Sequence, residues 1–284
     1  MTNRAGAHRA GDLTVSAVRS VAIQAATAAG EHARGSFRSA VPVEAVQPHD
    51  LKLSLDRACE AIIVASIRES FPFHGILSEE MGYAPGAEPY VWIADPLDGT
   101  VNFFHGIPFF CTCVSCHAIE EGNDSGGRFS LPDGKALGGV VAAAIYVPLE
   151  RELFVAAPHG GAFMNGTRLR IAPLSSLSEA IVSLSFSARD GSTGYISRLL
   201  PVMIERAQKV RSLGSTALDI VNVAAGRTGA FVQWGTNLWD FAAAAAILAE
   251  AGGVVDAHEI APGRFHIIAS NPGLISEIRQ VATA

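Results

Sequence analysis

The chain contains 284 residues, of which 49% are hydrophobic and 17% are charged. This composition supports a sizeable buried core in one large domain or two of ordinary size, and it excludes an intrinsically disordered chain. The formal net charge of −6 gives no indication of a general nucleic-acid binder, and an anionic ligand would need a local source of positive charge.

The longest apolar segments are too short to cross a membrane. Residues 136–149 and 241–249 carry no charge, but a membrane-spanning helix needs roughly 20 residues. The N-terminus contains Arg4 and Arg9 without an apolar segment behind them, so it does not have the pattern of a secretory signal. We therefore expect a cytoplasmic protein that binds neither membrane nor nucleic acid.

The N-terminal part, residues 12–172, is predicted to be α+β and to follow a flexible tail at residues 1–11. Helices are expected at residues 12–34, with Asp12 as the N-cap, and over residues 51–70, where apolar residues recur at helical spacing. The sequence is β-like at residues 37–46. Further strands are predicted at residues 74–77, 90–94, 109–119, 139–146 and 152–157, followed by a tight turn at residues 160–166.

The C-terminal part, residues 173–284, is predicted to be an α/β layer because strands and helices alternate there. The expected strands are residues 181–186, 210–213 and 229–234, and the expected helices are residues 195–208, 216–225 and 239–251. Between the two hairpin strands of the first part, residues 120–136 are polar and rich in glycine. We interpret them as a solvated insertion, with a contact to a partner or a second copy as the alternative.

Four cysteines are present, at positions 59, 111, 113 and 116. The last three precede His117 with a spacing that zinc sites and disulfides also use. However, residues 107–119 alternate with a period of two, which is typical of a strand, and free cysteine is a common buried strand residue. We predict core cysteines, and a metal site or a disulfide is the alternative.

The most informative segment is W-I-A-D-P-L-D-G-T at residues 92–100. An apolar strand ends there in Asp95 and Asp98, and two carboxylates on one rigid strand end suit Mg²⁺, which prefers oxygen ligands. If Gly99 and Thr100 open a short helix, their N–H groups can bind an anion beside that metal. Ordinary turn formation by the two aspartates is the alternative.

Two further acidic positions have the same character. Glu79 and Glu80 follow a predicted strand, and Asp240 stands at a predicted helix start among apolar residues. Capping of the helix is the alternative for Asp240.

Taken together and in this order, these motifs resemble the inositol monophosphatase family of Mg²⁺-dependent phosphatases, within the fructose-1,6-bisphosphatase-like superfamily. The resemblance rests on residues 92–103, on S-E-E at residues 78–80, and on W-D-F-A-A-A at residues 239–244 with E-A-G-G at residues 250–253. G-G-A-F-M-N-G at residues 160–166 and G-S-T-A-L-D at residues 214–219 also fit. The resemblance extends from about residue 13 to the end and implies a five-layered α-β-α-β-α sandwich, with the active site between its two halves.

The resemblance also implies two or three Mg²⁺ ions. Glu79, Asp95 and the Leu97 carbonyl would hold the first ion. Asp95, Asp98 and Asp240 would hold the second, and Glu79 would share a weaker third.

Catalysis is expected to depend on Asp56, Thr100 and Glu79. Thr100 and Asp56, which closes the segment D-L-K-L-S-L-D, would position and deprotonate the attacking water. The substrate would be bound by residues that the resemblance places around the metal ions: Asp98, Gly99, Thr100, Ser215, Thr216 and Gln233. A helix cap is an equally good interpretation of Ser215 or Thr216.

The chain departs from the family pattern at three positions. Lys52 and Leu53 replace an apolar residue and a threonine in the Asp56 segment, and Gln233 replaces a glutamate. Glutamine keeps one acceptor but loses the charge and adds donors, so the departure bears on substrate choice more than on the metal site. His74 and His105 lie near the motifs but match no required position, and we expect them to be surface or loop residues.

The expected activity is Mg²⁺-dependent hydrolysis of a small phosphate monoester, an inositol, cyclitol or sugar phosphate, by metal-activated water. Histidinol phosphate and fructose 1,6-bisphosphate are alternative substrates on the same site. 3′-Phosphoadenosine phosphate is disfavoured by V-N-F at residues 101–103. A non-catalytic regulatory protein of the same fold is the alternative from another class. The resemblance implies a homodimer.

Overall fold

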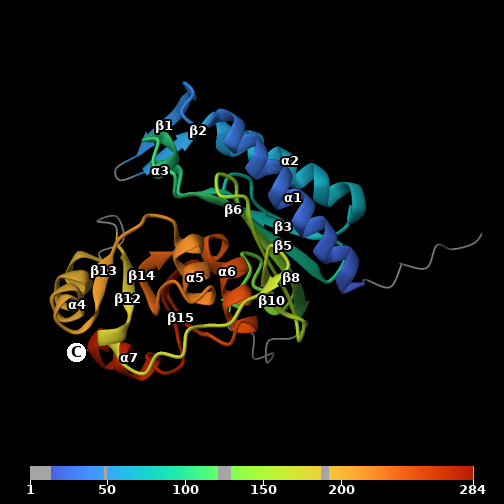
Figure 1. The fold of residues 1–284 in the computed structure, drawn as a ribbon. Coiled ribbons are helices and arrows are strands. Elements are labelled where there is room, and N and C mark those ends of the chain that lie inside the picture. Colours follow the sequence, from blue (N-terminus) through green and yellow to red (C-terminus); the bar gives the residue numbers. More distant parts are fainter. Residues whose placement is uncertain (1–13, 48–49, 121–128, 187–191, 284) are drawn as a thin grey trace, which may run out of the picture.

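The computed structural model describes residues 14–47, 50–120, 129–186 and 192–283. Its elements are stacked as helices, sheet, helices, sheet and helices, so the predicted α-β-α-β-α fold is confirmed (Figure 1). The outer helices on one side are α1 (Val15–Ser36) and α2 (Ser54–Ser70), and those on the other side are α4 (Thr193–Arg206) and α7 (Ile275–Thr283). Between the sheets lie α5 (Thr216–Ala224) and α6 (Leu238–Glu250). None of the described helices has both the length and the apolar character that a membrane span requires.

The first helix layer packs closely on the sheet because α1 is rich in alanine. A Cβ at Gly30 of α1 would lie 2.6 Å from the Tyr146 ring, so this position accepts only glycine at the observed spacing. The helix begins after Thr14, whose hydroxyl accepts a hydrogen bond of 3.2 Å from Ala17 N. The predicted N-cap, Asp12, lies outside the described residues, and the cap at Thr14 corrects that prediction.

The first sheet is mostly antiparallel and runs in the order β11-β10-β9-β8-β6-β5-β3-β4, with β7 beside β8. Only β3 and β5 pair in parallel among these strands. The strands are β3 (Gly75–Ser78), β4 (Gly82–Ala84), β5 (Tyr90–Asp98), β6 (Cys111–Glu120), β7 (Phe129–Ser130), β8 (Ala136–Val147), β9 (Glu152–Ala157), β10 (Gly161–Met164) and β11 (Thr167–Arg168). All four cysteines are free and buried, three of them on β6, which confirms the core interpretation.

Two predictions for this part need correction. The β-like stretch at residues 37–46 becomes a strand only from β1 (Val43–Gln47), which pairs with β2 (Asp50–Leu53) in a separate two-stranded sheet. Residues 160–166 contain β10 before their turn, because this segment adds a further strand beside β9.

The insertion at residues 120–136 is not wholly solvated. Residues 121–128 lie outside the described part, but the Phe129 ring makes edge contacts with Phe241 and Phe265 at 5.6 and 5.2 Å, and Leu131 is buried. The apolar side chains of this segment therefore pack against α6 and the second sheet. The prediction of a solvated insertion is wrong for this half of the segment.

The second sheet has the order β13-β12-β14-β16-β15. The strands β12 (Ile181–Ser185), β13 (Lys209–Arg211) and β14 (Ala230–Thr236) are parallel, and β16 (Arg264–Ser270) and β15 (Val254–Ala261) continue the sheet in antiparallel pairing. The sequence analysis did not predict β15, β16 or α7. One hydrophobic core extends from the first sheet through α5 and α6 to the second, so residues 12–172 and 173–284 share a core.

His74 lies in the loop before β3, but it is not at the surface. It is completely buried, and its Nδ1 accepts a hydrogen bond of 3.0 Å from Trp92 Nε1, while its Nε2 lies 3.0 Å from the Glu88 carboxylate. The aromatic neighbours of the ring explain why a polar side chain is held inside. His105 is exposed, as predicted.

Asp219 is a buried carboxyl group in the first turn of α5. Within the described part of the chain neither of its oxygens makes a hydrogen bond of good geometry. Burial raises the pKa of Asp219 to about 7, although the nearby Ser183 hydroxyl favours the ionised form. A group whose folded pKa lies above its unfolded value of about 3.9 destabilises the fold as the pH rises through this interval.

Asp219→Asn is therefore expected to raise the melting temperature relative to the wild type. The gain should be absent near pH 4, grow between pH 4 and 7, and reach on the order of 3 kcal/mol above pH 7. Thermal unfolding followed by circular dichroism across this range measures it. Asp133→Asn, whose carboxylate is paired with Lys135 at 3.2 Å, serves as the control and should show no gain. A gain for Asp219→Asn that does not depend on pH would contradict this account.

Candidate metal and phosphate site

The predicted acidic residues come together from four separate elements. Asp95 and Asp98 stand at the carboxyl end of β5, and Glu79 follows the end of β3, which runs parallel to β5 beside it. Asp240 lies in the first turn of α6 and Asp56 in the first turn of α2. All five therefore lie around one end of the first sheet, on the side where β3 and β5 finish.

The electrostatics show how close these groups are. Burial raises the pKa of Asp95 well above its ordinary value, and the neighbouring carboxyl groups of Glu79, Asp98 and Asp240 raise it further. Burial also raises the pKa of Glu79, again with help from Asp240 and Asp56. Groups that shift each other in this way share one low-dielectric region, and a bound cation would relieve their repulsion.

Asp98 connects the two halves of the molecule. Its Oδ2 accepts hydrogen bonds from Ser215 Oγ at 2.5 Å and Ala217 N at 2.7 Å, and its Oδ1 accepts one from Thr216 N at 3.2 Å. These donors form the N-terminus of α5, where a negative charge is favoured. Burial raises the pKa of Asp98 to about 7, and the three hydrogen bonds oppose that shift. Ser215 also accepts a bond from Leu218 N at 3.3 Å, so it is both a helix cap and a partner of Asp98.

One oxygen of the Asp240 carboxylate accepts three hydrogen bonds. Its Oδ2 accepts bonds from Thr236 Oγ1 at 2.7 Å, Asn237 N at 2.8 Å and Asn237 Nδ2 at 3.3 Å. Asn237 is in turn fixed by Arg264 of β16, whose Nη1 donates to its Oδ1 at 2.7 Å. Asp240 therefore does take part in capping α6, and these capping contacts orient its carboxylate.

Asp56 and the loop after Asp95 are also locally determined. Asp56 Oδ2 accepts a hydrogen bond of 2.7 Å from the backbone N–H of Leu53, the N-cap residue of α2. In the loop, Thr100 Oγ1 donates to the Leu97 carbonyl at 2.9 Å. Gly99 has φ = +96°, and a Cβ there would lie 2.8 Å from the Phe109 carbonyl oxygen. Glycine therefore permits the turn that places α3 (Thr100–Phe104) directly after Asp98.

The sequence analysis missed Glu60. This buried residue on α2 accepts three bonds on Oε1: from Ser78 Oγ at 2.5 Å, Met81 N at 2.9 Å and Glu80 N at 3.1 Å. It thereby shapes the turn that carries Glu79. Glu60 lies one helical turn after Asp56 on the same face, and that spacing in an otherwise apolar face could have identified it.

Asn102 was missed as well. Its Nδ2 donates to the carbonyls of Phe109 at 2.9 Å and Leu213 at 2.8 Å, which ties α3 to the segment that leads into α5. The Leu213 acceptor is a backbone atom 111 residues away in sequence, so no local sequence pattern predicts this contact.

Gln233 lies in the middle of β14, and the resemblance implies that it contacts the substrate. Its Oε1 accepts a hydrogen bond of 2.7 Å from Thr216 Oγ1. The acceptor that glutamine retains is therefore already used inside the protein, and the NH₂ group, a donor, is what it can add to the rim.

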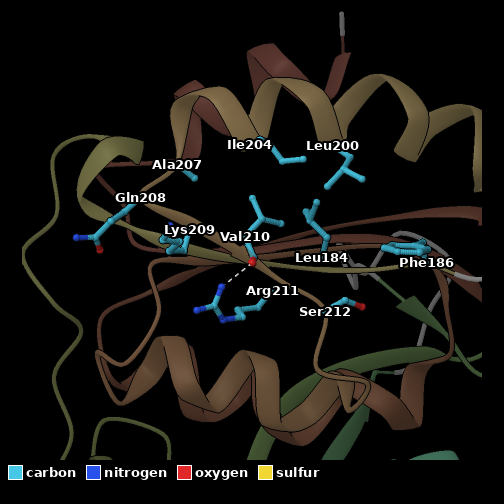
Figure 2. A pocket seen from close by; sticks show the side chains of 10 residues that line it. All are labelled: Leu184, Phe186, Leu200, Ile204, Ala207, Gln208, Lys209, Val210, Arg211 and Ser212. Atoms are coloured by element: carbon cyan, nitrogen blue, oxygen red, sulfur yellow. Dashed lines mark hydrogen bonds between the residues drawn. The ribbon is translucent and has the colours of Figure 1, made fainter.

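A cavity of about 390 Å³ lies between α4 and the strands β12 and β13. Figure 2 shows Leu200 and Ile204 of α4 facing Leu184 and Val210 of the sheet. It contains none of the predicted metal ligands, but its lining ends at Ser212, three residues before Ser215. The carboxylate cluster is therefore separate from this cavity, and the two are connected by the segment that runs from Ser212 to Ser215.

The donor set fits Mg²⁺. It consists of hard oxygen ligands, carboxylates and one carbonyl, with no sulfur or imidazole that would favour zinc. In the described ranges no three His, Cys, Asp or Glu side chains form a ready-made cluster for a metal ion. Mg²⁺ is usually bound by one or two protein carboxylates together with several waters, so a site for it does not require three such side chains in a ready-made cluster.

Comparison with known proteins identifies the family of the chain. The model of the inositol monophosphatase family matches residues 14–122 and 136–280. The chain is 34% identical to the Nus factor SuhB of Pseudomonas aeruginosa, over 88% of this chain and 90% of that one. It is 37% identical to an inositol-1-monophosphatase of Mesorhizobium japonicum, over 84% of this chain and 85% of that one.

A solved structure has the same fold. The extragenic suppressor protein suhB from Bartonella henselae superposes with a TM-score of 0.81 at 30% identity, and the match covers 94% of this chain and 98% of that one. The sequence motifs, the layered fold and these matches lead to one conclusion: the chain belongs to the inositol monophosphatase family.

Proposed function

We propose that this protein is a Mg²⁺-dependent phosphatase that hydrolyses a small phosphate monoester, an inositol, cyclitol or sugar phosphate. The observation that carries the proposal is the cluster of carboxyl groups of Glu79, Asp95, Asp98 and Asp240. Burial raises their pKa values, and neighbouring carboxyl groups raise those of Glu79, Asp95 and Asp98 further. Such a set is costly without a cation. Membership of the family supports the same chemistry.

The roles follow from the positions of the side chains. Glu79, Asp95 and the Leu97 carbonyl would hold one ion, and Asp95, Asp98 and Asp240 a second. Mg²⁺ supplies Lewis-acid stabilisation of the phosphoryl oxygens and a lower pKa for water.

The remaining groups would handle the water and the phosphate. Thr100 stands at the start of α3 with its hydroxyl on the Leu97 carbonyl, and Asp56 belongs to the same group of acids as Glu79. We assign these two residues to orienting the water and accepting its proton. The N–H groups of Gly99 and Thr100 would receive the phosphate oxygens.

Ser215, Thr216 and Gln233 would face the rest of the substrate. Thr216 already donates to Gln233, so the rim presents an amide NH₂ group where a glutamate would present a carboxylate. A donor favours acceptor groups on the substrate, so we place free inositol phosphates below other small phosphate esters in preference.

A regulatory role is the second candidate, because relatives such as that of Pseudomonas aeruginosa carry the name Nus factor SuhB. A regulatory protein would act without hydrolysing a phosphate ester, whereas an enzyme would hydrolyse one. Two further expectations belong to the proposal: a homodimer, which light scattering would detect, and a cytoplasmic location.

Asp95→Asn keeps the size of the side chain and removes its charge. We expect Mg²⁺-dependent phosphate release to fall by about 100-fold or more, because the residue is assigned to both ions. The assay is phosphate release from inositol, sugar, histidinol and nucleotide phosphates, each with Mg²⁺ and with a chelator. Asp256→Asn removes a charge that is ion-paired to Arg279 at 2.6 Å on β15 and should leave the rate unchanged. Absence of turnover on every ester would favour the regulator, and turnover that survives Asp95→Asn would refute the site.

Gln233→Glu restores the charge that the family has at this position. The relative rate on inositol phosphate over histidinol phosphate should rise by about three- to tenfold, because a carboxylate accepts hydrogen bonds from substrate hydroxyl groups. Competition between the two esters in one reaction gives the ratio directly. An unchanged ratio would show that Gln233 does not contact the substrate.

A further inference from the structure

Lys52 is a cation in a place where the family pattern has an apolar residue. Its Nζ lies 2.8 Å from Glu80 Oε1, and this pair adjoins Glu79 in the chain. The Lys52 side chain is 30% exposed and that of Glu80 only 5%. The ammonium group therefore lies between the buried acids and solvent, where an approaching ion or substrate would meet it.

The surroundings of Lys52 place it at the candidate site. It lies on β2, which continues directly into α2 and its Asp56, and β2 lies against α3, the helix that begins at Thr100 (Figure 1). A cation on this strand is thus near both the metal ligands and the segment assigned to the phosphate.

The electrostatics assign Lys52 an effect on Glu79. The Lys52 ammonium group is bonded to Glu80, the residue that directly follows Glu79 in the chain, so its charge lies beside the acids assigned to the metal. Lys52 therefore supplies part of the positive charge that the acids share with a bound divalent ion. Because its carboxylate is bound to Lys52, Glu80 does not act as a ligand of the ion.

We infer that Lys52 is a built-in counter-charge of the metal centre, which weakens Mg²⁺ binding on the Glu79 side, keeps Glu80 out of the ligand set and attracts the substrate's phosphate. The inference rests on the proposed function for its metal and its anion. Its physical basis is Coulombic: one positive charge acts with opposite sign on a cation and on an anion that bind within a few ångströms of it.

A structural role for Lys52 makes a different prediction. If the ion pair only held β2 to the turn after β3, removing it would loosen the site and weaken the binding of both ions. If Lys52 is a counter-charge, removing it strengthens the binding of Mg²⁺ and weakens the binding of phosphate. This opposition in sign separates the two explanations without any measurement of turnover.

The experiment is isothermal titration calorimetry on the full chain, first with Mg²⁺ and then, at saturating Mg²⁺, with inorganic phosphate. K52M should bind Mg²⁺ about fivefold more tightly and phosphate about fivefold more weakly than the wild type. K52R should resemble the wild type. K52M/E80Q removes one charge of each sign and should return both affinities toward the wild-type values. K135M removes a surface lysine that is paired with Asp133 and should change neither.

Each result decides something. Weaker binding of both ions by K52M, or no change in either, overturns the inference while the metal centre stands. A K52M protein that is unfolded by circular dichroism leaves the decision to K52M/E80Q and K52R: loss of Mg²⁺ binding in both would overturn the inference. A wild-type chain that binds no Mg²⁺ refutes the proposed metal centre itself, and with it the role of Lys52.

Discussion

Repulsion among like charges is the constraint around which this molecule is organised. Asp95, Asp98, Glu79 and Asp240 reach one region from the first sheet and from α6. Burial raises the pKa values of all four, and neighbouring carboxyl groups raise those of Asp95, Asp98 and Glu79 further. An arrangement of this kind persists only if the fold supplies donors and cations to each carboxylate. The structure supplies donors to Asp98 and Asp240, and it places the Lys52 cation beside the turn that carries Glu79.

The supports come from elements that are otherwise ordinary. The N-terminus of α5 binds Asp98, the capping box of α6 orients Asp240, and Glu60 shapes the turn behind Glu79. Asp98 is bound across the divide between the two sheets, so the site itself helps to join the halves of the sandwich. This explains why a shared core and a shared site occur together here.

Much of the fold around the site could be predicted from local sequence patterns. The strand that leads to Asp95 and Asp98 and the helices that hold Asp56 and Asp240 were predictable, because apolar residues recur at strand or helix spacing beside these acids. The strands β15 and β16 were not predicted, since their residues alternate weakly and their partners are each other and β14. The burial of His74 was missed for a related reason: Trp92 and Glu88, which contact its ring nitrogens, lie 18 and 14 residues away in sequence.

The supporting contacts of the site were less accessible to sequence reasoning. Arg264 reaches Asn237 from a strand that was not predicted, and Thr216 meets Gln233 only because α5 and β14 are adjacent. Chain-specific features such as Lys52 were visible as departures from a pattern. Their consequence became clear only once Glu80 was found beside the ammonium group.

The central claim is that the buried acids form a site for divalent cations, and thermal unfolding tests it most directly. A protein that binds Mg²⁺ in its folded state alone gains stability with rising Mg²⁺ concentration by mass action. We predict a melting temperature that climbs with Mg²⁺ at constant ionic strength, and an Asp240→Asn variant that has lost most of this rise. Equal melting temperatures in Mg²⁺ and in Na⁺ of matched ionic strength would contradict the account.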